Sequence, residues 1–137
     1  MSDTATVAQD WTDVAAAWDA HVDEVDDHSA AATAALLERV AVQPGDRVLE
    51  LAAGPGTLGA TWSQLVGPGG SVLLSDIAPG MVEVARRRNR GVASVSVEVL
   101  DASAIDRPDA SFAKDIQLPA SQHRRRPVKA FEPYVPE

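Results

Sequence analysis

The chain has 137 residues, a formal net charge of −8 and no cysteine. This length suits one domain with a real core, and the lack of cysteine excludes disulfides and thiolate metal sites. No apolar run approaches the roughly 18 residues that a membrane span needs. Residues 1–9 also lack the basic start and apolar middle of a secretory signal, so we expect a cytoplasmic protein without a membrane span.

The negative charge is concentrated at the N-terminus. Residues 1–28 hold eight acids and no lysine or arginine, whereas the other twelve acids and twelve bases cancel. A segment with this charge repels phosphate backbones, which argues against nucleic acid as a partner. The pattern predicts an acidic N-terminal helical segment over residues 1–28.

Two helices are expected before the first strand. Apolar residues recur at helical spacing from Trp11 to Val25, and the aromatic stripe should pack against the domain behind it. A lid over a substrate is the alternative role for this helix. Ser29 is a suitable N-cap for a second helix over 30–42. The buried side of that second helix is predicted to contain Leu36, Leu37 and Val40.

Strands and helices then alternate. Short apolar runs bounded by glycine and proline predict strands over 47–52, 71–76 and 95–100. Helices are expected over 57–66 and from Pro79 to the arginine run that precedes Gly91. Three strands alternating with helices through short connections predict an α/β fold with a parallel, Rossmann-like sheet over residues 29–112.

A glycine-bearing loop follows the first strand. Gly54, Gly56 and Gly59 satisfy G-x-G-x-x-G, and Asp76 follows at about the distance of a ribose-binding acid, so a dinucleotide site is one interpretation. Glu50 argues against it, because a carboxylate beside this loop would repel a pyrophosphate. A cofactor that carries positive charge and no phosphate would suit the same carboxylate better.

Three segments resemble one known family, the class I S-adenosylmethionine-dependent methyltransferases. VLELAAGPG, residues 48–56, resembles the family's first motif. SDIAPGMVEVAR, residues 75–86, resembles the second motif of its ubiquinone and menaquinone biosynthesis-like branch, and VEVLDASAID, residues 97–106, resembles the third. The spacing of all three segments agrees, and the resemblance covers about residues 11–112.

The resemblance implies S-adenosylmethionine as cofactor and three carboxylates that bind it. Glu50 would steady the loop and the methionine end, Asp76 would accept hydrogen bonds from the ribose hydroxyls, and Asp101 would take the adenine amino group. The other implied contacts come from the loop and from the residues next to these acids: Ala52, Gly54, Gly56, Ile77 and Ala102. We assign no catalytic base and no metal, because the sulfonium itself supplies the leaving group.

The alternating pattern stops after Phe112. Residues 113–137 hold four prolines and the run HRRR, and are predicted to form a loosely packed tail. Relatives continue with further strands, so we expect a sheet that is incomplete after strand three and a domain truncated on its C-terminal side. Catalysis by this chain alone should then be weak or absent. An unpaired sheet edge could also support an oligomer.

The sequence therefore predicts methyl transfer to an unidentified small-molecule acceptor. Two alternatives stay open at this point. One is an NAD(P)-binding oxidoreductase domain, which the formal glycine pattern allows. The other is a non-catalytic interaction protein that uses the exposed sheet edge and the basic tail.

Overall fold

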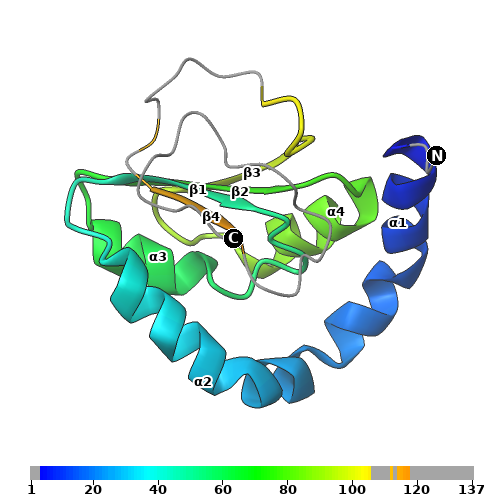
Figure 1. Cartoon of the computed structure of the whole chain (residues 1–137), viewed down its shortest axis with the longest axis horizontal. Helices are drawn as coiled ribbons and strands as arrows, with labels where there is room; N and C mark the ends of the chain where they lie inside the picture. Colours follow the sequence, from blue (N-terminus) through cyan, green and yellow to red (C-terminus); the bar gives the residue numbers. More distant parts are fainter. Residues whose placement is uncertain (1–3, 106–111, 113, 118–137) are drawn as a thin grey trace.

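The computed structural model describes residues 4–105, 112 and 114–117, and Figure 1 shows the whole chain. None of the helices in this described part is long and apolar enough to cross a membrane. In chain order the elements are α1 (Thr4–Ala20), α2 (Val22–Val40), β1 (Arg47–Leu51), α3 (Gly59–Val66), β2 (Ser71–Asp76), α4 (Pro79–Arg88), β3 (Val95–Val99) and β4 (Lys114–Gln117).

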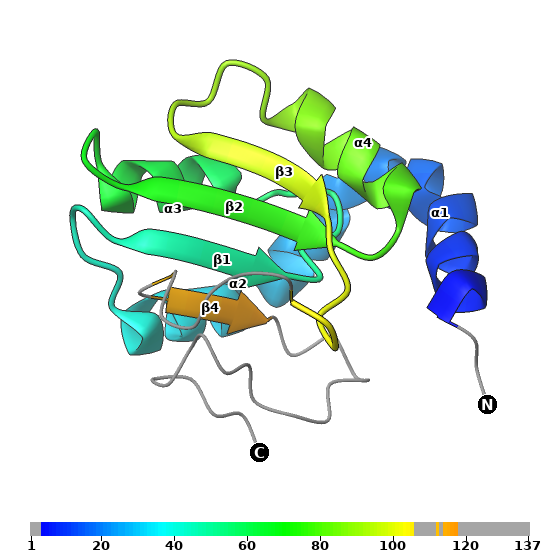
Figure 2. The same ribbon diagram turned by 90° about the horizontal axis from the view of Figure 1, so that it is seen from above.

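The strands form one parallel sheet in the order β3-β2-β1-β4 (Figure 2). The predicted fold class is confirmed, and the three predicted strands end within one residue of their observed ends. Of the predicted tail, residues 113 and 118–137 lie outside the described residues. The expectation that the sheet ends after strand three is wrong by one strand, because β4 pairs with β1 from Val48 opposite Lys114 to Leu51 opposite Gln117. Its sequence, KDIQ, has one apolar residue in four, so no hydrophobic run marks it.

The larger core lies between the sheet and helices α2, α3 and α4, which Figure 1 shows together below the strands. Alternate residues of β1 and β2 face these helices, as the two-residue period of a strand requires. Trp62 and Val66 of α3 are fully buried there. Burying side chains of this size contributes roughly 1.5–3 kcal/mol each. The cluster also contains Leu36, Val40, Val42, Val48, Ala53, Val72, Leu74, Val82, Ala85 and Val97.

The opposite face of the sheet is covered by the segment that follows β3. Leu49, Leu51 and Leu73 point to this face and are buried. The residues packed against them are Leu100, Ala102, Ile105 and Phe112. This packing holds the end of β3 and the residues after it over the centre of the sheet.

The two N-terminal helices differ in their bounds from those predicted. α1 begins at Thr4 and ends at Ala20, and α2 starts at Val22, so the break falls at His21. The prediction that Ser29 caps a second helix is wrong. Ser29 lies inside α2 and its hydroxyl donates to the carbonyl of Val25 at 2.9 Å. This bond satisfies the hydroxyl within the helix, so serine can occupy an interior position there. No proline or glycine interrupts the backbone hydrogen bonds of α2.

α1 packs across α4 beyond the carboxyl ends of the strands (Figure 2). Ala15 and Trp18 contact a small cluster on and before α4, as the predicted stripe requires. The hydroxyl of Thr12 accepts a hydrogen bond from the amide of Gly80 at 3.1 Å. Trp11 and Val14 lie at the edge of this contact and are 39% and 41% exposed. The stripe is therefore core contact at one end and solvent-facing at the other.

The arginine run at the end of α4 is bound to α1. Asp19 accepts from Arg87 and from Arg88, each at 2.7 Å. The hydrogen bond from Arg88 lowers the pKa of Asp19, and Arg87 acts in the same direction. Two of these arginines therefore connect the acidic N-terminal segment to the domain.

Candidate functional site

Glu50 lies near the end of β1, and its carboxyl group is buried on the side of the sheet that packs against α3. It is 1% exposed, and its Oε1 accepts a hydrogen bond from the indole Nε1–H of Trp62 at 2.6 Å. Burial raises the pKa of Glu50 to about 7, against the effect of the Trp62 hydrogen bond, and the nearby charge of Asp76 raises it further. The carboxyl group is therefore poised to gain or lose a proton near neutral pH.

Asp76 ends β2 and holds the loop from the other side. Its Oδ2 accepts from the amide of Gly54 at 2.9 Å, and its Oδ1 accepts from the amide of Ala78 at 3.0 Å. Burial raises the pKa of Asp76, although the amides of Ala78 and Gly54 oppose this shift. The carboxylate thus joins the glycine loop to the start of α4, and its remaining lone pairs can accept further hydrogen bonds.

The glycine loop has one open side and one packed side. Gly54 has φ +57°, and a Cβ built there would meet nothing within 4 Å. Gly56 has φ +75°, and a Cβ there would lie 2.8 Å from the Cβ of Ala85 and 2.9 Å from Nδ2 of Asn89. A Cβ at Gly59 would also collide with Asn89. Gly54 and Gly56 were both expected to contact the cofactor. Gly54 faces open space that a ligand could enter, whereas side chains at the end of α4 fill the space at Gly56.

Ala52 precedes this loop in an unusual backbone conformation. Its φ is +52°, in the left-handed region that costs a residue with a Cβ roughly 1–2 kcal/mol. The neighbouring peptides hold it there: the amide of Ala53 donates to the carbonyl of Ser75 at 2.8 Å, and the Ser75 hydroxyl donates to the carbonyl of Glu50 at 2.8 Å. The ends of β1 and β2 are therefore tied together at the point where the loop begins.

Asp101 follows β3, and the backbone brings it beside the end of β2. The amide of Leu100 donates to the carbonyl of Asp76 at 3.0 Å. Oδ1 of Asp101 accepts from both the amide and the hydroxyl of Ser103, at 2.8 and 2.6 Å. Within the described part of the chain, Oδ2 has no such partner. Asp101 therefore caps its own loop and keeps one oxygen for another donor.

The two remaining predicted site residues lie next to these acids. Ile77 is half-buried directly after Asp76, and Ala102 is half-buried against the sheet face that carries Leu49. The structure thus brings all eight predicted site residues to the carboxyl ends of three neighbouring strands. This is the edge at which open parallel sheets bind ligands.

The three acids at this edge have no cationic partner among the residues that the structure describes. No lysine or arginine among residues 4–105, 112 and 114–117 forms an ion pair with Glu50, Asp76 or Asp101. Two of the three are buried, where an uncompensated negative charge is costly. The arrangement therefore favours a ligand that brings positive charge and hydrogen-bond donors.

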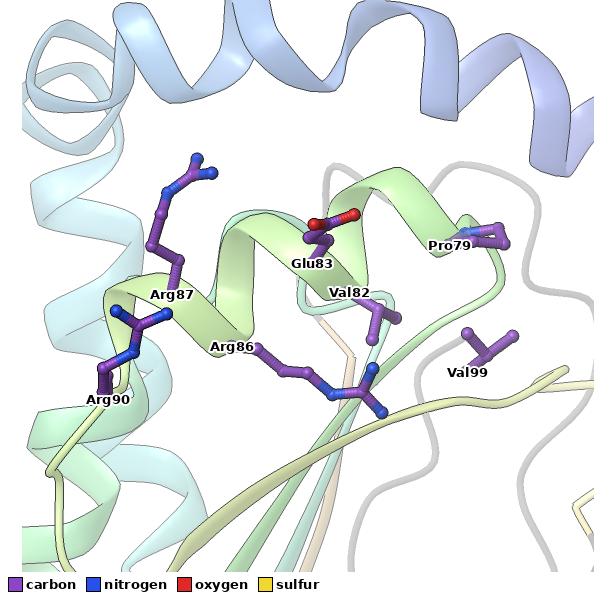
Figure 3. A pocket seen from close by; sticks show the side chains of 7 residues that line it. All are labelled: Pro79, Val82, Glu83, Arg86, Arg87, Arg90 and Val99. Atoms are coloured by element: carbon purple, nitrogen blue, oxygen red, sulfur yellow. The ribbon is translucent and has the colours of Figure 1, made fainter.

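A separate open groove of about 580 Å³ runs along α4 beside β3 (Figure 3). It contains none of the predicted site residues. Arg86 crosses it and donates through Nε and Nη2 to the carbonyl of Val97, at 3.2 and 3.0 Å. The groove is lined by Pro79, Val82, Glu83, Arg86, Arg87, Arg90 and Val99.

A family model described as a methyltransferase domain matches residues 48–130. This chain belongs to that methyltransferase family. Two similar proteins are ubiquinone/menaquinone biosynthesis C-methyltransferases. The enzyme of Ectopseudomonas oleovorans is 43% identical over 79 residues, which are 56% of this chain and 46% of the relative. That of Stenotrophomonas maltophilia is 47% identical over 74 residues, which are 52% of this chain and 29% of the relative. The chain thus matches less than half the length of each.

Solved methyltransferase structures share the fold. A SAM-dependent methyltransferase from Aquifex aeolicus aligns with a TM-score of 0.61 and 23% identity, over 72% of this chain and 55% of that one. A putative methyltransferase in complex with the Trm112 activator of Haloferax volcanii aligns with a TM-score of 0.64 and 23% identity, over 78% and 46%. The resemblance to class I methyltransferases is confirmed, and the dinucleotide alternative is not favoured.

Two residues of the site were not predicted from the sequence. Trp62 of α3 donates a hydrogen bond to Glu50. This contact could have been predicted, because a buried indole needs an acceptor and Glu50 is the acid on the face of β1 that packs against α3. Asn89 packs under the loop from the end of α4, and nothing in the local sequence separates it from an ordinary helix end. Both residues support the loop from the helix side.

Proposed function

We propose that this methyltransferase domain binds S-adenosylmethionine at the carboxyl ends of β1, β2 and β3 and directs its methyl group to a small-molecule acceptor. One observation carries the proposal: Glu50, Asp76 and Asp101 meet at this edge without a cationic partner in the described structure. S-adenosylmethionine carries an ammonium, a sulfonium, ribose hydroxyls and an adenine amino group. A pyrophosphate would instead add negative charge to buried carboxylates.

The residues present fit this cofactor. Gly54 offers backbone with open space above it, so a ligand can approach closely. Asp76, held by the amides of Gly54 and Ala78, keeps lone pairs for the ribose hydroxyls. Asp101 keeps Oδ2 for the adenine amino group, and half-buried Ile77 supplies apolar surface next to it. Glu50 is buried against α3 and acts through its charge.

The bound cofactor would supply the activated methyl group on its sulfonium. The chain's own residues contribute alignment and a negative field that holds the cation, and these are the main protein contributions to such a transfer. In such a transfer the methyl–sulfur bond would break as the bond from the methyl group to the acceptor forms, which would leave S-adenosylhomocysteine as a neutral thioether, and the proton of the acceptor would pass to solvent. The similar curated proteins are C-methyltransferases by name, so we favour a carbon acceptor.

Titration calorimetry with S-adenosylmethionine, S-adenosylhomocysteine, NAD⁺ and NADPH tests this proposal. We expect heat with the first two ligands and none with the nucleotides. Heat with a nicotinamide cofactor alone would reject the proposal in favour of an oxidoreductase domain. Absence of heat with all four, together with a defined oligomer, would favour a non-catalytic interaction protein.

A further inference from the structure

Asn89 closes α4 with a buried side chain that makes contacts outside its own helix. Only 8% of the residue is exposed. Its Nδ2 donates to the carbonyl of Ala85 at 2.8 Å, as a helix-capping group would, and also to the carbonyl of Gly56 at 2.9 Å. Both amide hydrogens are therefore used, one on its own helix and one on the loop. A buried amide with both donors satisfied fixes the groups that it joins.

The loop is consequently held at two points. Asp76 binds the amide of Gly54, and Asn89 binds the carbonyl of Gly56. The same carbonyl accepts from the amide of Gly59 at 3.3 Å, so the Asn89 contact also fixes the entry into α3. The absence of a Cβ at Gly56 and Gly59 leaves the room that Asn89 occupies. The open face of the loop is at Gly54, which Asp76 binds directly, and it lies two residues before the Asn89 contact.

We propose that Asn89 is a positioning residue for the cofactor loop. It touches the loop from the helix side and holds Gly54 to Gly56 in the form that accepts the cofactor. Glycine peptides with positive φ have many alternative conformations, so a loop without this fastening must be ordered when the ligand binds. This inference rests on the proposed function for its ligand. Its structural part, the fixing of the loop, can be measured without any ligand.

The test compares Asn89→Ala with Ser63→Ala. Ser63 donates from α3 to the carbonyl of Ala93 at 2.6 Å, so this control removes a hydrogen bond near the same elements without touching the loop. S-adenosylhomocysteine binding is measured by calorimetry, and amide hydrogen exchange is measured in the ligand-free proteins. If Asn89→Ala does not fold, Asn89→Ser takes its place, because the hydroxyl leaves a smaller gap.

We expect Asn89→Ala to weaken S-adenosylhomocysteine binding about tenfold and to speed exchange at the amides of Gly56 and Gly59. Ser63→Ala should bind like the wild type and leave these two amides unchanged. Unchanged binding by Asn89→Ala, or equal loss in both variants, would overturn the role of Asn89. Wild-type protein that takes no S-adenosylhomocysteine would instead overturn the proposed function, and the exchange data would still decide whether Asn89 fixes the loop.

Discussion

Replacing Glu50 with glutamine distinguishes two effects of its buried charge: the lower stability of the folded protein and the stronger binding of a cationic cofactor. Burial raises the pKa of Glu50 from 4.5 to about 7. The folded state thus holds its proton more tightly than the unfolded state, so stability is lost as pH rises from 4.5 to 7 and is constant above that. At 1.36 kcal/mol per pKa unit, the loss from this group is roughly 3 kcal/mol. Glutamine keeps the size of the side chain and an oxygen that accepts from Trp62, but it does not titrate, so its stability does not fall with pH in this way.

The assay is urea unfolding of wild type and Glu50→Gln at several pH values between 5 and 8. The difference between their free energies of unfolding should grow in favour of the variant as pH rises, by roughly 2–3 kcal/mol between pH 5 and 8. Asp76 also has a raised pKa and adds pH dependence of the same sign. It is present in both proteins, so its contribution cancels in the difference apart from its electrostatic coupling to Glu50. Parallel pH curves for the two proteins would refute the reasoning.

Cofactor binding should change in the opposite direction. A cation favours ionised Glu50, so wild-type affinity for S-adenosylmethionine should rise with pH up to about 7. At pH 8 the variant should bind it about tenfold more weakly, since interactions with a charged group contribute about 1.5–3 kcal/mol. The affinity for S-adenosylhomocysteine, which lacks the sulfonium charge, should fall less in the variant than the affinity for S-adenosylmethionine. As a control, Trp62→Phe keeps the charge but removes its donor, and should move the pH midpoint upward. Equal affinity of variant and wild type at pH 8 would contradict the electrostatic role.

Three further outcomes are expected. Asp76→Asn should cost about tenfold in S-adenosylhomocysteine affinity, measured by calorimetry, because an amide cannot accept from Gly54 and its second amide partner together; unchanged affinity would remove Asp76 from the site. Gly59→Ala should lower the free energy of unfolding by about 1–3 kcal/mol, measured in urea, since the new Cβ overlaps Asn89; wild-type stability would show that this packing yields easily. Asp19→Ala should lower the thermal midpoint slightly at low salt, and added salt should abolish the difference, because its two ion pairs are partly exposed; a salt-independent loss would point to packing instead.

The sequence was most informative where apolar runs end in glycine or proline. β1, β2 and β3 were placed within one residue, because buried parallel strands are continuous hydrophobic runs and the turns after them need special backbone. β4 could not be predicted, since its pairing with β1 and not its composition defines it. The break at His21 was missed for a similar reason: no proline or glycine marks the change of direction between α1 and α2.

The sequence identified residues that lie together at one edge of the sheet, but it did not show which neighbour requires each of them. The eight predicted residues do meet at one edge, because the carboxyl ends of parallel strands share it. Gly56 was expected to serve the ligand, whereas its bare Cα makes room for Ala85 and Asn89. Such requirements depend on residues about thirty positions away in the chain, and no local pattern reports them.

The most direct test is a titration of the ¹⁵N-labelled protein with S-adenosylmethionine, followed by amide chemical shifts. The central claim is that the cofactor binds at the carboxyl ends of β1, β2 and β3. It predicts saturable shifts concentrated at Gly54, Ile77 and Ala102 and their neighbours. Shifts confined to the groove between α4 and β3, around Arg90, or no saturable shifts at all, would contradict it.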